Sequence, residues 1–282
     1  MLLGMNLLLW TRHVLPAQYE LFGLLARTGY DGVELPVMTG EARQYRDMGR
    51  ALDDLGLRRT GLTVLAGPGR SCISDDAQVR QAALDHIRWA VDCLAEAGGE
   101  VLCGPFHQPL FDIHGRPPTA LEHERLVDVH RQAADHAAAA GIRLAMEPLN
   151  RFECYVCTTT SQAAALVAQV GRDNYGFLYD TFHANIEETD PVAALRTHLP
   201  SVAHVHLSEN DRGAPGLGHV PWEATLRTLK QSAYAGWCVI ESFGRRPANP
   251  GPAVRIYRDM CASHADIYAG GHDFLRALWA RL

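Results

Sequence analysis

The chain has 282 residues, of which 47% are hydrophobic, enough for a full core and too many for a disordered protein. The formal net charge is −6, so we expect neither a nucleic-acid-binding surface nor a basic face for an anionic membrane. The longest apolar stretches, such as LLLW, fall far short of the roughly 20 residues that a membrane span needs.

The N-terminus lacks the basic lead-in and the cleavage site of a signal peptide. The seven cysteines have no regular spacing, which fits a reducing compartment better than a disulfide framework, and we expect a cytoplasmic location. Cys154 and Cys157 form a lone CxxC, which we interpret as incidental because no second pair accompanies it.

Short apolar, β-prone runs alternate along the chain with helical stretches. In order, the runs are residues 5–10, 32–37, 59–66, 100–106, 143–149, 176–181, 202–209 and 238–243. The clearest helical stretches, 79–98 and 121–141, contain Ala and Leu at helical spacing. Each ends in a glycine, as helices often do.

Strict alternation of strand and helix implies right-handed βαβ units and a parallel sheet. Eight such units in a chain of this length predict an α/β fold of the (β/α)8 TIM barrel type, as a single domain over residues 1–282. An open doubly wound sheet is the alternative, but no GxGxxG follows the first predicted strand.

Four consecutive predicted strands end in a residue that can bind a metal ion: Glu147, Asp180, His206 and Glu241. The active site of such a barrel lies at the carboxyl ends of its strands. Strand side chains alternate between faces, and this parity can be applied to three of these strands. If the apolar residues at 144 and 146 face the helices, Glu147 faces inward. By the same alternation, His204 and His206 face the barrel interior on the seventh predicted strand. Glu241 faces the interior on the eighth.

Three carboxylates brought together with nothing between them would repel one another and be partly protonated. A divalent cation removes that problem. A donor set of three oxygens and one nitrogen, with no thiolate, favours Mn²⁺, Co²⁺ or Mg²⁺ over structural zinc. A single strand-end carboxylate often only caps a loop, but four such residues on successive strands predict a metal site.

Four segments of the chain resemble the signature segments of the ketose 3-epimerases. They are EPLNRFE, YDTFHANIEE, HVHLSENDRGAPGLGHVPW and VIESF. This family includes D-tagatose, D-psicose (D-allulose) and L-ribulose 3-epimerases and has a xylose-isomerase-like TIM barrel. The resemblance implies that the four strand-end residues are the metal ligands, with Mn²⁺ or Co²⁺ favoured. It further implies ketose-binding roles for Glu153, His183 and Arg212, and a homodimer or homotetramer.

The activity that this resemblance implies is epimerisation of free ketoses at C3, of the D-tagatose, D-fructose or L-ribulose type. The reaction removes a proton from the carbon next to the C2 carbonyl and returns one to the opposite face. It therefore needs two acid/base groups that flank C3. Glu147 and Glu241, on the fifth and eighth predicted strands, lie across the mouth of the barrel and are the natural pair.

Other positions near strand ends have two readings each. Trp10 and Phe106, at the ends of the first and fourth predicted strands, could form an apolar wall for the sugar or pack in the core. Glu34 could be a polar group at the mouth, or it could lie at the surface or at the rim of the core. We interpret His204 as a core histidine that is satisfied by hydrogen bonds.

Alternatives remain open at this point. The same metal scaffold serves aldose–ketose isomerases, hydroxypyruvate isomerase and inosose dehydratase. A sugar phosphate is an alternative substrate, because Arg212, Arg245 and Arg246 follow strands whose loops bind phosphate in many barrels. An apurinic endonuclease would need more histidine ligands and a basic face. A non-catalytic sugar-binding barrel would be expected to have lost one of the two glutamates.

Overall fold

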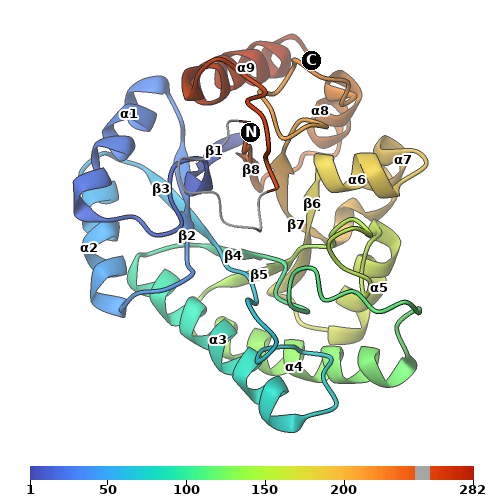
Figure 1. Cartoon of the computed structure of the whole chain (residues 1–282). Helices are drawn as coiled ribbons and strands as arrows, with labels where there is room; N and C mark the ends of the chain where they lie inside the picture. The colour runs from blue at the N-terminus through green and yellow to red at the C-terminus, as the bar shows by residue number, and fades with distance from the viewer. Residues whose placement is uncertain (245–254) are drawn as a thin grey trace.

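A closed parallel barrel forms the centre of the molecule, with helices around it (Figure 1). The computed structural model describes residues 1–244 and 255–282. Within these residues eight strands follow one another around the barrel in sequence order, and the last pairs with the first. The prediction of a (β/α)8 TIM barrel is confirmed.

The strands are β1 (Leu2–Asn6), β2 (Gly32–Pro36), β3 (Arg58–Leu62), β4 (Val101–Gly104), β5 (Arg143–Met146), β6 (Tyr175–Asp180), β7 (Val202–Leu207) and β8 (Trp237–Ile240). The α-helices are α1 (Glu20–Thr28), α2 (Ala42–Asp53), α3 (Ala77–Glu96), α4 (Ala120–Ala139), α5 (Thr160–Val170), α6 (Thr181–Glu187), α7 (Pro191–His198), α8 (Trp222–Gln231) and α9 (Gly271–Arg281). Four shorter turns are η1 (Leu7–Leu9), η2 (Pro16–Gln18), η3 (Leu199–Ser201) and the π-helical η4 (Asp266–Gly270).

The two long helices predicted from the sequence begin and end with ordinary capping chemistry. The Asp76 side chain accepts a hydrogen bond from the N–H of Gln78 at the start of α3. Thr119 and Glu122 form a capping box at the start of α4. Gly98 and Gly141, which follow the two helices, have φ of 70° and 71°, a left-handed conformation that glycine adopts without steric cost.

Strand side chains divide into two sets, as the parity argument predicts. Ala145, Leu178 and Val239 belong to a small cluster of strand residues inside the barrel. Leu144 and Met146 belong instead to the large core cluster that also contains the helix residues. By this alternation, Glu147, two residues after Ala145, and Glu241, two residues after Val239, face the barrel axis. The end of β6 faces the axis as well.

The first strand begins and ends earlier than predicted, so Trp10 is not part of it. β1 ends at Asn6, whose side chain accepts a hydrogen bond from the N–H of Leu8 and so caps η1. Trp10 therefore lies beyond a turn rather than at a strand end. Phe106 likewise lies past Gly104, the last residue of β4, where φ is 122°.

Register places polar residues of neighbouring strands side by side. Asn6 on β1 is opposite Glu34 on β2, and Glu34 is opposite Thr60 on β3. On the other side of the barrel, Asp180 on β6 is opposite His206 on β7. Among the described residues, no helix is both long enough and apolar enough to cross a membrane.

Candidate active site

Four buried side chains converge at the carboxyl ends of β5 to β8. Glu147, Asp180, His206 and Glu241 each offer one ligand atom, and these atoms all lie within 4.8 Å of one another. The Nδ1 atom of His206 is 3.5 Å from Glu241 Oε2, 3.9 Å from Asp180 Oδ2 and 4.0 Å from Glu147 Oε1. None of the four residues is more than 4% exposed. The structure thus brings together the four strand-end residues that the sequence singled out.

The chemistry of this cluster fits a divalent cation. Glu147 Oε1 and His206 Nδ1 are buried and have no hydrogen-bond partner among the described residues. Burial, with repulsion from Glu241 second, raises the pKa of Glu147 well above its usual range, and burial raises that of Asp180. Three hard oxygen donors and one imidazole form a set that suits Mn²⁺, Co²⁺ or Mg²⁺. A cation at this point would bind both unpaired atoms and relieve the repulsion between the carboxylates.

Arg212 contacts two carboxylates of the cluster and two side chains outside it. Its Nη1 atom donates to Asp180 Oδ2 at 2.9 Å and to Glu241 Oε2 at 2.7 Å. Its Nη2 atom lies 2.9 Å from His183 Nε2, and its guanidinium lies 4.0 Å from the centre of the Phe182 ring. Arg212 is 8% exposed, so its positive charge acts on these carboxylates with little screening by water.

The backbone of Arg212 is held in an unusual conformation. Its φ is 62°, in the left-handed region, which costs a non-glycine residue of the order of 1 kcal/mol. The N–H of Arg212 donates to the carbonyl of Glu209, and its own carbonyl accepts from Phe243 N–H and the Ser242 hydroxyl. Loop hydrogen bonds therefore aim this side chain at the cluster.

Asn150 forms hydrogen bonds with two more of the predicted site residues, His183 and Glu153. Its backbone N–H donates to His183 Nδ1 at 3.1 Å, and its side-chain amide donates to Glu153 Oε1 at 2.9 Å. Burial, with the charge of Arg212 second, holds the pKa of His183 well below its usual range, so the imidazole is neutral. Burial raises the pKa of Glu153. Asn150 lies inside the signature segment EPLNRFE, but no sequence pattern distinguished it from its neighbours there.

A cavity of about 730 Å³ opens above the cluster at the mouth of the barrel. Its lining includes the predicted residues Glu147, Glu153, His183, Arg212 and Glu241. Apolar side chains form much of the remaining wall, among them Leu8, Met38, Leu65, Phe111, Phe182 and Phe243. A volume of this size lies within the range of small-molecule sites in proteins.

Trp10 and Phe106, which the sequence left open as cavity wall or core packing, are not among the residues that line the cavity. Trp10 packs against Tyr268 and His264, with ring centres 5.8 and 5.9 Å apart. Phe106 is fully buried and packs against the ring of His130. Both lie beyond their strand ends, so strand parity does not apply to them. Arg245 and Arg246 lie outside the described residues.

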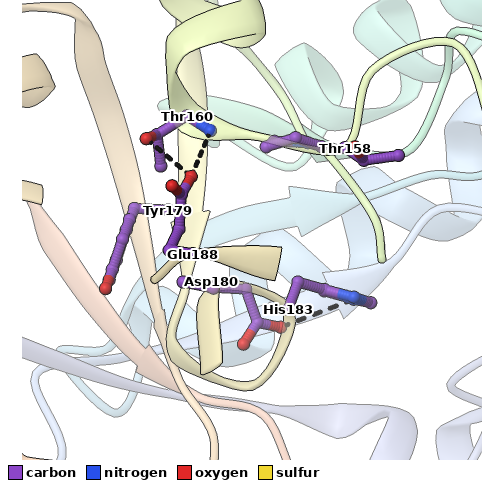
Figure 2. Close-up of a pocket in the computed structure, with 8 residues that line it drawn as sticks. Thr158, Thr160, Tyr179, Asp180, His183 and Glu188 are labelled. Carbon is purple, nitrogen blue, oxygen red and sulfur yellow. Dashed lines mark hydrogen bonds and ion pairs between the residues drawn. The ribbon is translucent and has the colours of Figure 1, made fainter. Parts of the chain in front are cut away.

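The carboxylates that follow His183 in sequence have structural partners. Glu188 accepts hydrogen bonds from the N–H and hydroxyl of Thr160, whereas Asp180 and His183 point toward one another (Figure 2). Glu187 pairs with the exposed Arg151. Neither Glu187 nor Glu188 therefore takes part in the cluster.

Glu34 and His204 lie inside the barrel rather than at its mouth. Both are fully buried, and His204 Nε2 lies 2.7 Å from Glu34 Oε2. His204 is thus a core histidine, as expected, but it is only half satisfied, because its Nδ1 atom has no hydrogen-bond partner among the described residues. Burial opposes ionisation of Glu34, but His206 and His204 outweigh it and hold its pKa well below the usual range.

Cys154 and Cys157 are free, buried thiols. Burial raises the pKa of both, that of Cys154 to about 12, so neither is a thiolate at neutral pH. The interpretation of this CxxC as incidental agrees with these surroundings.

Comparison with known proteins gives a consistent picture over most of the chain. The family model described as xylose isomerase-like TIM barrel matches residues 22–277. The chain is 30% identical over 259 residues to D-psicose 3-epimerase of Agrobacterium fabrum, covering 90% of this chain and 89% of that protein. It is 29% identical over 284 residues to ketose 3-epimerase of Arthrobacter globiformis, covering 98% and 96%.

A solved structure extends the likeness to three dimensions. The crystal structure of D-allulose 3-epimerase from Methylomonas sp. in complex with D-allulose matches this chain with a TM-score of 0.90. Sequence identity is 25%, over 98% of this chain and 96% of the other. The likeness therefore covers nearly the whole chain.

Proposed function

Because the chain belongs to the ketose 3-epimerase family of xylose isomerase-like TIM barrels, we propose that it inverts the configuration of ketoses at C3 with a bound divalent cation. The substrates proposed are free ketoses of the D-tagatose/D-sorbose, D-fructose/D-allulose and L-ribulose/L-xylulose type. Relatives named for D-psicose and L-ribulose, and a relative's complex with D-allulose, support this range.

The proposed metal ligands are Glu147, Asp180, His206 and Glu241, and Mn²⁺ or Co²⁺ is the proposed ion, with Mg²⁺ the third candidate. Their ligand atoms lie within 4.8 Å of one another, and two of these atoms are buried without a hydrogen-bond partner among the described residues. When bound, the cation would polarise the C2 carbonyl and offset the negative charge that forms when C3 loses its proton.

Two glutamates would carry out the proton transfers. Glu147 follows β5 and Glu241 follows β8, and both line the cavity. One carboxylate takes the C3 hydrogen as a proton, and the electron pair of the broken C–H bond moves into the enediolate of the sugar. The other glutamate delivers a proton to the opposite face of C3. In the reverse reaction the two residues exchange roles.

Three further residues would hold the sugar in place. Arg212 brings a guanidinium, His183 a neutral imidazole and Glu153 a carboxyl group to the same end of the cavity. Together they offer hydrogen-bond donors and acceptors for the hydroxyl groups near C1 to C3. Fixing these hydroxyls keeps C3 between the two glutamates, which is how positioning lowers a reaction barrier.

The observation that carries this proposal is that Glu147 and Glu241 follow two non-adjacent strands, β5 and β8, belong to one buried cluster and both line the cavity. An aldose–ketose isomerase moves hydrogen between C1 and C2 and has no need of a second base at C3. The proposed enzyme must exchange the C3 hydrogen with solvent.

The test is incubation of the Mn²⁺-loaded protein in D₂O with D-tagatose, D-fructose or L-ribulose, and with their phosphates. NMR should detect deuterium at C3 of both epimers, and chelation of the metal should abolish the exchange. Deuterium at C1 or C2 with an aldose as product would assign the protein to the isomerases instead. Activity confined to the phosphates would overturn the assignment to free sugars.

The family resemblance also leads us to propose a homodimer or homotetramer. Phe152, at the rim of the cavity, is 61% exposed, and Leu217 is 78% exposed, so apolar side chains are present on the surface for such contacts. Light scattering after gel filtration measures the mass directly, and a mass of 31.0 kDa would contradict this part of the proposal.

A further inference from the structure

A second group of buried side chains lies inside the barrel beneath the proposed metal ligands. It consists of Glu34, Cys103, His204 and His206, and it shares His206 with the cluster above. All four are fully buried. Their composition alone would fit a second metal site, so their hydrogen bonds decide what the group does.

The oxygens of Glu34 are already surrounded by hydrogen-bond donors. Oε1 lies 2.7 Å from His206 Nε2 and accepts from Asn6 Nδ2 at 2.9 Å. Oε2 lies 2.7 Å from His204 Nε2 and accepts from the Thr60 hydroxyl at 2.9 Å. The thiol of Cys103 donates to the same oxygen at 3.2 Å. An ion bound to Glu34 would have to replace these bonds, so the group is a hydrogen-bond network centred on Glu34 rather than a second metal site.

From this network we infer that Glu34 is a positioning residue, which fixes the tautomer and ring orientation of His206 for metal binding. Glu34 Oε1 accepts a hydrogen bond from the N–H at Nε2 of His206. The proton is therefore on Nε2, and Nδ1 keeps a free lone pair. That atom is the one that faces Glu147, Asp180 and Glu241 at 3.5–4.0 Å. A carboxylate behind a metal-bound histidine also increases the basicity of the ligand.

The same network reaches one of the two proposed acid/base residues. The Asn6 amide donates to Glu34 Oε1 at 2.9 Å and to Glu241 Oε1 at 3.2 Å. Oε2 of Glu241 is thereby left to face His206 Nδ1. Asn6 thus connects the orientation of His206 to that of Glu241. The strand register that places Asn6 beside Glu34 makes this connection part of the barrel itself.

The test rests on the proposed metal site and compares Mn²⁺ affinity, by competition with a chelating indicator, in the wild type and in Glu34→Gln. The amide is a weaker acceptor, and its NH₂ must face one of the two imidazole N–H groups. We expect about a 10- to 100-fold loss of affinity. Glu34→Asp, which keeps a carboxylate one carbon further back, should lie between the wild type and Glu34→Gln.

A matched control is Glu122→Gln on α4. Glu122 is also buried and accepts several hydrogen bonds, from Arg116, Thr119 and Tyr155, but it is not part of the cavity lining. This variant should keep wild-type Mn²⁺ affinity and the wild-type absorption spectrum of bound Co²⁺, whereas Glu34→Gln should change that spectrum. Loss of affinity in both variants alike would mean that general destabilisation, rather than positioning, is the cause.

A measurement on the wild type keeps the inference testable even if Glu34→Gln fails to fold. Proton NMR of the Co²⁺-loaded protein should contain one shifted imidazole N–H signal that exchanges slowly with water, because Glu34 and the barrel bury it. A fast-exchanging signal, or wild-type affinity in Glu34→Gln, would overturn the inference. A wild type that binds no divalent cation would overturn the proposed function itself, and the inference with it.

Discussion

Glu147 and Glu241 have different surroundings although they share one site. Burial and the charge of Glu241 raise the pKa of Glu147, whereas His206 and Arg212 outweigh burial and lower that of Glu241. A glutamine at either position keeps the shape and the oxygen donor but cannot accept the C3 proton. In the proposed mechanism, each glutamate therefore has a role that its amide cannot fill.

We expect Glu147→Gln and Glu241→Gln each to lower the epimerisation rate by about 10²–10⁴-fold. The remaining carboxylate can still remove and return a proton on its own side. Each variant should therefore catalyse deuterium exchange at C3 of one epimer only, with the two variants acting on opposite epimers. NMR in D₂O measures this, with bound Mn²⁺ determined in parallel. Exchange of both epimers by either variant would contradict the two-base mechanism.

At the scale of elements, strand parity determined which side chains point inward, and it could be read from the sequence. It placed His206 on β7, and Glu147 and Glu241 directly after β5 and β8, because apolar residues alternate with them along these strands. Parity does not extend far past a strand end, so it gives no orientation for Trp10, four residues after β1, or for Phe106, two residues after β4.

The helix ends give a test at the same scale. Gly141 follows α4 with φ of 71°, and a Cβ atom there would meet nothing within 4 Å. Gly141→Ala should therefore destabilise the protein by about 1–2 kcal/mol through backbone conformation alone. Gly115→Ala is the matched control, since its Cβ also meets open space and its φ is not positive. Urea denaturation measures both, and equal stability of the two variants would contradict this explanation.

At the scale of the whole molecule, the sequence predicted the barrel but not the contacts across it. Asn6, Glu34 and Thr60 each look like a single polar residue in an apolar strand. Their connection to His204 and His206 depends on the height of each strand along the barrel axis, and hydrophobic periodicity does not report that height. Asn6 and Thr60 were missed for this reason, and the position of Glu34 was left open between the mouth and the surface or core rim.

Metal binding should change the stability of the whole molecule in a pH-dependent way. In the metal-free protein Glu147 and Asp180 have raised pKa values, so the native state keeps protons that the unfolded state releases. Metal-free stability should therefore fall as pH rises above the ordinary carboxyl range. A cation must displace these protons, so it binds more weakly at low pH.

We accordingly expect Mn²⁺ to raise the melting temperature more at about pH 8 than at about pH 6. At 100 times the Kd, the stabilisation is about 2.7 kcal/mol. Scanning calorimetry with and without Mn²⁺ measures the shift, and Asp180→Asn is the control, since loss of one ligand should reduce it at both pH values. An equal shift at both pH values, or a larger one at the lower pH, would contradict the proton competition.

The barrel interior beneath the cluster is closed. Asn6, Glu34 and His204 fill it, and none of them is more than 1% exposed. A cation would therefore reach His206 through the mouth, past Glu147 and Glu241, and a sugar bound in the cavity would occupy that same route. Under the proposed function, binding and release would then be ordered, with the ion entering first and leaving last. A bound sugar would keep the ion in its site during turnover.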